Sequence, residues 1–162
     1  MMTTAPADVG DHNQADVMFA QMMIPHHQQA IEMAQLASSR ASNADVKALA
    51  AQIQAAQQPE IDEMKGWLVS WNVPVMPDGT GHNMPGGMMS SDDMAELEGL
   101  TGAAFDREFL TSMTTHHQGA IDMAKAEQAN GSYEPAKTMA ANIIRTQTEE
   151  INTMAELLKS IP

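Results

Sequence analysis

The chain repeats itself at an offset of 90 residues. Residues 16–68 align without a gap on residues 106–158, and 20 of the 53 paired positions are identical. Self-similarity of this kind indicates a duplicated structural unit. We therefore expect two similar halves, 16–71 and 106–160, related by a pseudo-two-fold axis.

Each half is predicted to be a helical hairpin. In the first half, one face of a helix recurs with i, i+4, i+7, i+11 spacing, at Phe19, Met23, His26, Ala30, Met33 and Ala37. The pattern breaks over 38–43, and a second helix runs to about Trp71. Ser42 and its counterpart Ser132 are the predicted N-caps of the second helix of each hairpin. Two hairpins with short turns predict an all-α, antiparallel four-helix bundle, with residues 1–162 as a single domain.

A linker rich in Met, Gly and Pro joins the two halves. Residues 73–90 contain three Pro and four Gly, which exclude regular structure over most of the segment. A short helix over 91–97 is expected to follow. The linker carries Met76, His82, Met84, Met88 and Met89. Exposed methionines in such a loop contribute little to packing, so their presence favours capture or transfer of a soft metal ion.

Composition excludes several classes of function. The chain has 21 acidic and 8 basic residues and a net charge of -13, which argues against binding to nucleic acid or to anionic membranes. No apolar run approaches the ~20 residues that span a bilayer. Cysteine is absent, which excludes disulfides, thiolate nucleophiles and Cys-ligated metals. The 16 methionines exceed what core filling usually requires.

Two His-His pairs occupy equivalent places in the two halves. His26 falls near the centre of the predicted buried stripe and His27 at its edge, and His116 and His117 repeat this geometry. One interpretation is a hydrogen-bond network between helices. In it, His26 bonds Glu60 or Gln57, and His116 bonds Glu150 or Gln147. His12, near the N-terminus, is expected to be a solvated tail residue.

The second interpretation of these pairs is a metal site. Imidazole suits copper, zinc and nickel, and thioether selects monovalent copper and its surrogate silver. Cu(I) is therefore favoured, with Cu(II) as a possibility. The candidate ligands are Met22, Met23, His26, His27, Met33, Glu60, Met64, His82, Met84, Met88, Met113, His116, His117, Met123, Glu150 and Met154.

The two halves are not identical in their metal-binding residues. Pro25 precedes His26 in the middle of a helix and is expected to kink it, whereas Thr115 stands at the equivalent position. Met18 and Met22 are replaced by Glu108 and Ser112. The first half is therefore richer in soft ligands.

The doubled motif, MIPHHQQAIEMA and MTTHHQGAIDMA, resembles that of the bacterial domain-of-unknown-function family 305. The resemblance extends from about Asp16 to Leu158. It implies a ferritin-like four-helix fold in secreted, periplasmic or lipoprotein-anchored proteins, some of them similar to copper- and silver-binding proteins of copper tolerance. It carries over to Met23, His26, His27 and Met33, and to their counterparts Met113, His116, His117 and Met123.

Three functions follow from these patterns. The first is an extracytoplasmic copper-binding protein for chaperoning, buffering or resistance, with a copper-transport protein as a possible partner. An oxidising compartment favours Met over Cys as a soft ligand. The second is a structural or interaction module in which His and Met only pack. The third is a ferritin-like di-metal oxidase, which is less favoured because neither Glu60 nor Glu150 begins a Glu-x-x-His motif.

Overall fold

The computed structural model describes residues 12–75 and 88–162, which form five helices and no strand. The helices are α2 (Gln14–Arg40), α3 (Ala44–Ser70), α4 (Ser91–Glu98), α5 (Gly102–Asn130) and α6 (Glu134–Ser160). The predicted all-α class is confirmed, and α4 is the short helix expected after the linker. The candidate ligands His82 and Met84, and the linker methionine Met76, lie outside the described residues.

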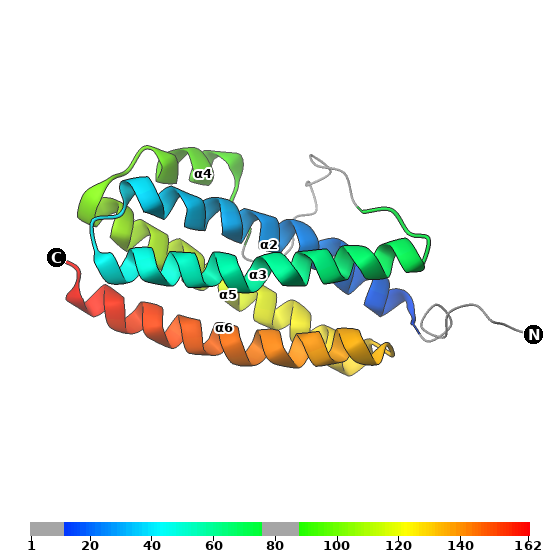
Figure 1. The fold of residues 1–162 in the computed structure, drawn as a ribbon. Coiled ribbons are helices and arrows are strands. Elements are labelled where there is room, and N and C mark those ends of the chain that lie inside the picture. The colour runs from blue at the N-terminus through cyan, green and yellow to red at the C-terminus, as the bar shows by residue number, and fades with distance from the viewer. Residues whose placement is uncertain (1–11, 76–87) are drawn as a thin grey trace, which may run out of the picture.

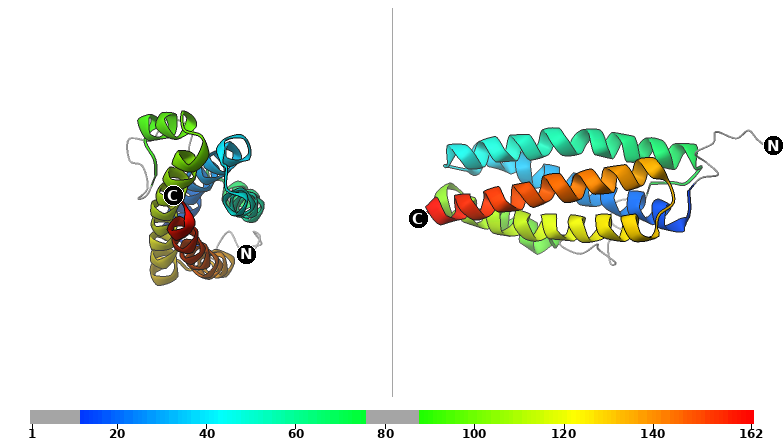
Figure 2. Two further views of the ribbon diagram at one scale, coloured as in Figure 1. Left: turned by 90° about the vertical axis from the view of Figure 1, so that its left-hand side faces the viewer. Right: turned by 90° about the horizontal axis from the view of Figure 1, so that it is seen from below.

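The four long helices run alongside one another (Figure 1). Helix α3 packs against α2, α6 packs against α5, and α2 and α5 join the two hairpins. Helices α2 and α5 run in opposite directions (Figure 1). The short helix α4 lies beside α5, on the outside of the molecule (Figure 2). Residues of α2 and α5 that face each other are therefore the best enclosed.

The caps of the long helices differ from the prediction. Asn43, not Ser42, is the N-cap of α3 and accepts hydrogen bonds from the backbone of Asp45 and Val46. Tyr133, not Ser132, is the N-cap of α6, and it makes no side-chain cap bond. An amide acceptor one residue closer to the helix is better placed for the free N–H groups of the first turn than the Ser42 hydroxyl.

The two serines instead bind an aspartate of the opposite hairpin. Ser42 donates its backbone N–H and its hydroxyl to Asp106, at 3.2 and 2.9 Å. Ser132 donates the same two groups to Asp16. Both aspartates are buried, and each also accepts the next backbone N–H, that of Asn43 or Tyr133. These bonds fix each hairpin turn against the first turn of the other hairpin.

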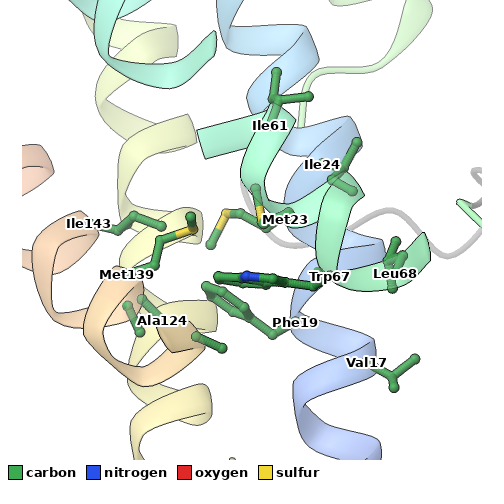
Figure 3. Packing of buried hydrophobic residues seen from close by; sticks show 14 of the residues in the cluster. Val17, Phe19, Met23, Ile24, Ile61, Trp67, Leu68, Ala124, Met139 and Ile143 are labelled. Atoms are coloured by element: carbon green, nitrogen blue, oxygen red, sulfur yellow. The ribbon is translucent and has the colours of Figure 1, made fainter. Parts of the chain in front are cut away.

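Two hydrophobic clusters fill the interior, one on each side of the histidines along α2 and α5. In the first, Phe19, Met23 and Met139 gather around the Trp67 indole (Figure 3). The second contains Phe105 and Phe109 together with Met89 and Leu97. The expectation that linker methionines are exposed is wrong for Met89, which is buried and whose backbone is held against α2 by two hydrogen bonds with Gln29. Met88 is half-buried.

Two prolines lie inside helices without ending them. Helix α2 continues through Pro25, and α3 continues through Pro59. The loop between α2 and α3 is also shorter than predicted, since α2 extends to Arg40.

His12 is not a solvated tail residue. Its ring stacks on Trp71 with centroids 4.3 Å apart, because the end of α3 lies next to the start of α2.

Candidate metal centre

Four histidines form the polar centre of the molecule where α2 and α5 face each other. His26, His27, His116 and His117 are each at most 1% exposed. The rings of His26 and His116 are in contact across the two helices, with centroids 3.7 Å apart. His27 and His117, predicted to lie at the edge of the buried stripe, are also fully buried, because α3 and α6 cover that edge.

Each half contains the same His–Glu hydrogen bond. His27 Nε2 lies 2.6 Å from Glu60 Oε1, and His117 Nε2 lies 2.6 Å from Glu150 Oε1. The predicted network had assigned these carboxylates to His26 and His116. Consecutive helical residues point about 100° apart, so the first histidine of each pair faces the other hairpin and the second faces its own hairpin partner.

These bonds leave ring nitrogens available. A neutral imidazole that donates through Nε2 carries a lone pair on Nδ1. The Nδ1 atoms of His27 and His117 are buried and have no hydrogen-bond partner among the described residues. A carboxylate that holds one ring nitrogen while the other is free is the usual arrangement of a metal-binding histidine.

His116 offers a further nitrogen. Its Nε2 is buried without a hydrogen-bond partner among the described residues. Burial lowers the pKa of His116 well below its usual range, and the nearby His26, His117 and His27 lower it further. The ring is therefore neutral at physiological pH and able to present a lone pair to a cation.

Two glutamines were noted in the sequence but not included among the candidate ligands. Gln57 and Gln147 are 3% exposed, and each Oε1 lacks a hydrogen-bond partner in the described part of the chain. Each stands three residues before the glutamate of its own half, so it lies one turn away on the same face. Their spacing of three residues from Glu60 and Glu150 was the sequence signal that could have identified them as part of the centre.

The structure separates the candidate methionines into groups. Met23 and Met113 are fully buried and lie one turn from the first histidine of each pair. Met64 and Met154 are also fully buried, and the sulfur of Met154 accepts a weak bond from the Thr114 hydroxyl.

Other members of the set lie outside the centre. Met33 is seven residues beyond His26, about 10 Å along the helix, and belongs to the second cluster. Met22 and Met123 line a separate hollow between α2 and α5.

The centre is rich in nitrogen and sulfur donors rather than carboxylates. Within residues 12–75 and 88–162, no three His, Asp or Glu side chains are grouped so that they could together hold a metal ion. The candidate donors here are imidazole nitrogens of the four buried histidines, with the thioethers of Met23 and Met113 one turn away along the helices. In the same described ranges, no helix combines the length and apolar character needed to cross a membrane.

Solved structures share this fold over nearly the whole chain. A DUF305 protein of Streptomyces coelicolor, described as a candidate secreted protein, is 32% identical, with a TM-score of 0.84 and coverage of 90% of this chain and 93% of its own. A DUF305 fragment from Deinococcus radiodurans is also 32% identical, with a TM-score of 0.83 and coverage of 91% and 97%.

A third relative, CopM, has been solved with metals. Its Cu(II)-bound form is 36% identical to this chain, with a TM-score of 0.78 and coverage of 90% and 96%. CopM has also been solved in Cu(I)-bound, Ag-bound and apo forms.

The sequence comparisons identify the family directly. No protein among curated sequences matches the chain. The family model described as "Domain of unknown function (DUF305)" matches residues 16–158, which include both His-His pairs and both His–Glu bonds. The chain therefore belongs to the DUF305 family.

Proposed function

We propose that this protein binds monovalent copper, with silver as a surrogate, at the histidine centre between α2 and α5. The observation that carries the proposal is the pair of buried Nδ1 atoms, on His27 and His117, which have no hydrogen-bond partner in the described part of the chain while each Nε2 bonds a glutamate. The metal-bound forms of CopM support it, because CopM shares this fold at 34–36% identity.

The residues of the centre have distinct roles. Glu60 and Glu150 accept the Nε2 protons and hold each imidazole in the tautomer that leaves a lone pair on the buried Nδ1. Two of the imidazoles of His27, His117 and His116 supply nitrogen to the ion, since no three described His, Asp or Glu side chains are grouped to hold a metal. Met23 and Met113 supply thioether sulfur. The surrounding apolar clusters exclude water. A buried site favours a monovalent over a divalent ion, since the cost of removing charge from water is smaller.

The biological role we propose is binding without catalysis, in extracytoplasmic copper chaperoning, buffering or resistance. The absence of cysteine and the abundance of methionine suit an oxidising compartment. The relation to a candidate secreted protein supports this location. The net charge of -13 raises the local concentration of cations near the surface. A copper-transport protein is the expected partner, and we assign the arrangement of the long helices to the ferritin-like four-helix bundles.

A purely structural role for the histidines is the second candidate, because the two His–Glu bonds also tie α2 to α3 and α5 to α6. In that case the free Nδ1 atoms would carry no ligand. The same measurement separates the two functions.

The test is an anaerobic titration of metal-free protein with Cu(I) against a chromophoric chelator. The wild type is expected to remove Cu(I) from the chelator at a defined stoichiometry. The double variant His27→Gln with His117→Gln should lose the equivalent of Cu(I) bound at the centre while retaining its helical circular dichroism spectrum. Glu63→Gln, a substitution on the exposed face of α3, is the control. A wild type that does not compete, or a double variant that competes equally well, would overturn the proposal in favour of a structural role.

A further inference from the structure

The groove between α2 and α5 is closed at one end and hollow at the other. At the closed end, Met89 and Leu97 pack over Phe105 and Phe109 in the second cluster. At the opposite end, toward the start of α2 and the end of α5, a cavity of about 260 Å³ opens to solvent between the same two helices. Its lining is Ala15, Met18, Phe19, Met22, Met123, Ala126, Glu127 and Asn130.

Three thioethers border this cavity from two helices. Met18 and Met22 lie one turn apart on α2, and Met123 lies on α5, which runs antiparallel to α2 (Figure 1). Met22 and Met123 are half-buried, and Met18 is 49% exposed. An unbranched side chain with a polarisable sulfur can swing into such a space.

The fold does not require methionine at these places. The positions 90 residues after Met18 and Met22 are Glu108 and Ser112, which bond each other at 2.8 Å on the surface of α5. The counterpart of Met123 is Met33, which is fully buried. Equivalent helical sites thus accept polar residues, so packing alone does not account for the cluster of sulfur atoms at this end.

A carboxyl group without an N–H or hydroxyl donor lines the same cavity. Glu127 is 2% exposed, and neither of its oxygens accepts a hydrogen bond from such a donor among the described residues. Its neighbour is Asp16, and both carboxyl groups lie against Gly131, where a Cβ would collide with them.

These two acids share one negative charge at neutral pH. Burial raises the pKa of Glu127 to about 9, and its hydrogen bond to Asp16 and the charge of Asp16 add to the rise. Burial opposes ionisation of Asp16. Hydrogen bonds from Glu127 and from the backbone of Asn13, Ser132 and Tyr133 outweigh it and lower the pKa of Asp16. A single negative charge beneath an apolar, sulfur-lined hollow suits a monovalent soft cation better than a divalent one.

We propose that Met18, Met22 and Met123 form a second binding site for a monovalent soft metal ion such as Cu(I) or Ag(I), apart from the histidine centre. The site draws its metal class from the function proposed above but shares no ligand with the centre. It is open to solvent, whereas the centre is enclosed, so it can take up an ion directly from the surroundings.

The test is a titration with Ag(I), which needs no reductant, followed through the ¹³C-labelled methionine methyl groups by NMR. The triple variant Met18→Leu, Met22→Leu, Met123→Leu removes the thioethers at nearly constant volume. Met94→Leu with Met139→Leu is the matched control outside the cavity. The His27→Gln, His117→Gln variant isolates the proposed site from the centre.

We expect the methyl signals of the three methionines to shift together in the wild type and in the histidine variant. The triple variant should bind one equivalent less than the wild type or the control. Unchanged stoichiometry in a folded triple variant, or unmoved methyl signals in the wild type, would overturn the proposal and leave the cavity as an apolar docking surface. If the triple variant fails to fold, the wild-type methyl shifts decide. If the triple variant loses one equivalent of Ag(I) and the histidine variant loses none, the methionine site is supported and the proposal of a metal site at the histidine centre is overturned.

Discussion

The two ends of the α2–α5 groove differ although the same pair of helices forms both. At one end, Asp16 has a second acid, Glu127, beside it, and the groove is open and lined with methionine. At the other end, Asp106 faces a position where Glu127 is replaced by Ala37, and Met89 and Leu97 cover the groove. Between them, the His–Glu bonds are 2.6 Å long in both halves.

This contrast separates two kinds of constraint. The centre lies where the two halves meet, so a change in either half disturbs both. The residues at each end of the groove contact only one hairpin turn and its neighbours, so the two ends can differ in sequence. Four predictions test this distinction, in order of decreasing effect.

The largest effect is expected at the aspartate anchors. Asp106→Ala leaves the backbone N–H groups of Ser42 and Asn43 without an acceptor and should cost roughly 2–4 kcal/mol of unfolding free energy. Asp16→Ala should cost less, about 1–2 kcal/mol, because Glu127 can ionise and accept from the same turn. Urea unfolding of both variants, with the exposed Asp122→Ala as control, measures the difference. Equal losses would contradict a special role for Glu127.

The second effect concerns the carboxylates that hold the histidines. Glu60→Ala and Glu150→Ala should each weaken Cu(I) binding by about 10–100-fold, because each frees one imidazole to rotate. The loss should be greater for Glu150, whose side chain is 7% exposed against 22% for Glu60. Competition against a chelator gives both affinities. A loss confined to one half would show that the centre is not shared.

The third effect is a pH dependence of stability that arises from Glu127, at the open end of the groove. Between pH 4.5 and about 9 the folded chain keeps the Glu127 proton and the unfolded chain has lost it, so stability falls as pH rises through this window. Glu127→Gln should remove this slope and be more stable than the wild type at pH 8–9, by about 1–3 kcal/mol.

The measurement for Glu127 is urea unfolding across pH 5 to 9. The exposed Glu149→Gln serves as the control and should keep the wild-type slope. A Glu127→Gln variant with the same slope as the wild type would show that Glu127 ionises normally in the folded protein. Below pH 4 the lowered pKa of Asp16 acts in the opposite direction, and stability falls as pH falls.

The smallest effect is expected for a variant that should not gain Ag(I) binding. Glu108→Met with Ser112→Met copies the two α2 methionines into the second half. No additional Ag(I) should bind, because Met33, the counterpart of Met123, is fully buried in the second cluster. Titration with Ag(I) and methyl NMR measure it. A new equivalent of Ag(I) would mean that the methionines alone, and not the open groove, make the site.

Much of the fold was predictable from helical spacing and from Gly and Pro positions, because these act within one turn of chain. The short helix α4 and the approximate ends of α3 are examples. Caps were less predictable, since Ser42 and Asn43 are both good candidates and only the position of Asp106 shows that Ser42 is engaged elsewhere.

The site was predicted in its residue types but not in its pairings. The sequence indicated His26, His27, Glu60 and their counterparts as a set, and it offered Glu60 or Gln57 as the partner of His26. In the structure Glu60 and Glu150 instead bond the second histidine of each pair. Asp16 and Asp106 carried a signal that was not used, since they are identical at the 90-residue offset. Glu127 and the exposed Met18 had no such signal, because their counterparts differ.

The helices, the doubled pattern and the kinds of donor available were all predictable from the order of the residues, because periodicity and composition depend only on neighbours along the chain. The tertiary structure alone decided which imidazole faces which carboxylate, which methionines reach the centre and which line the hollow. Those choices depend on how α2 and α5 pack against each other and on what covers their groove. These contacts join residues far apart along the chain, such as His27 with Glu60 and His26 with His116.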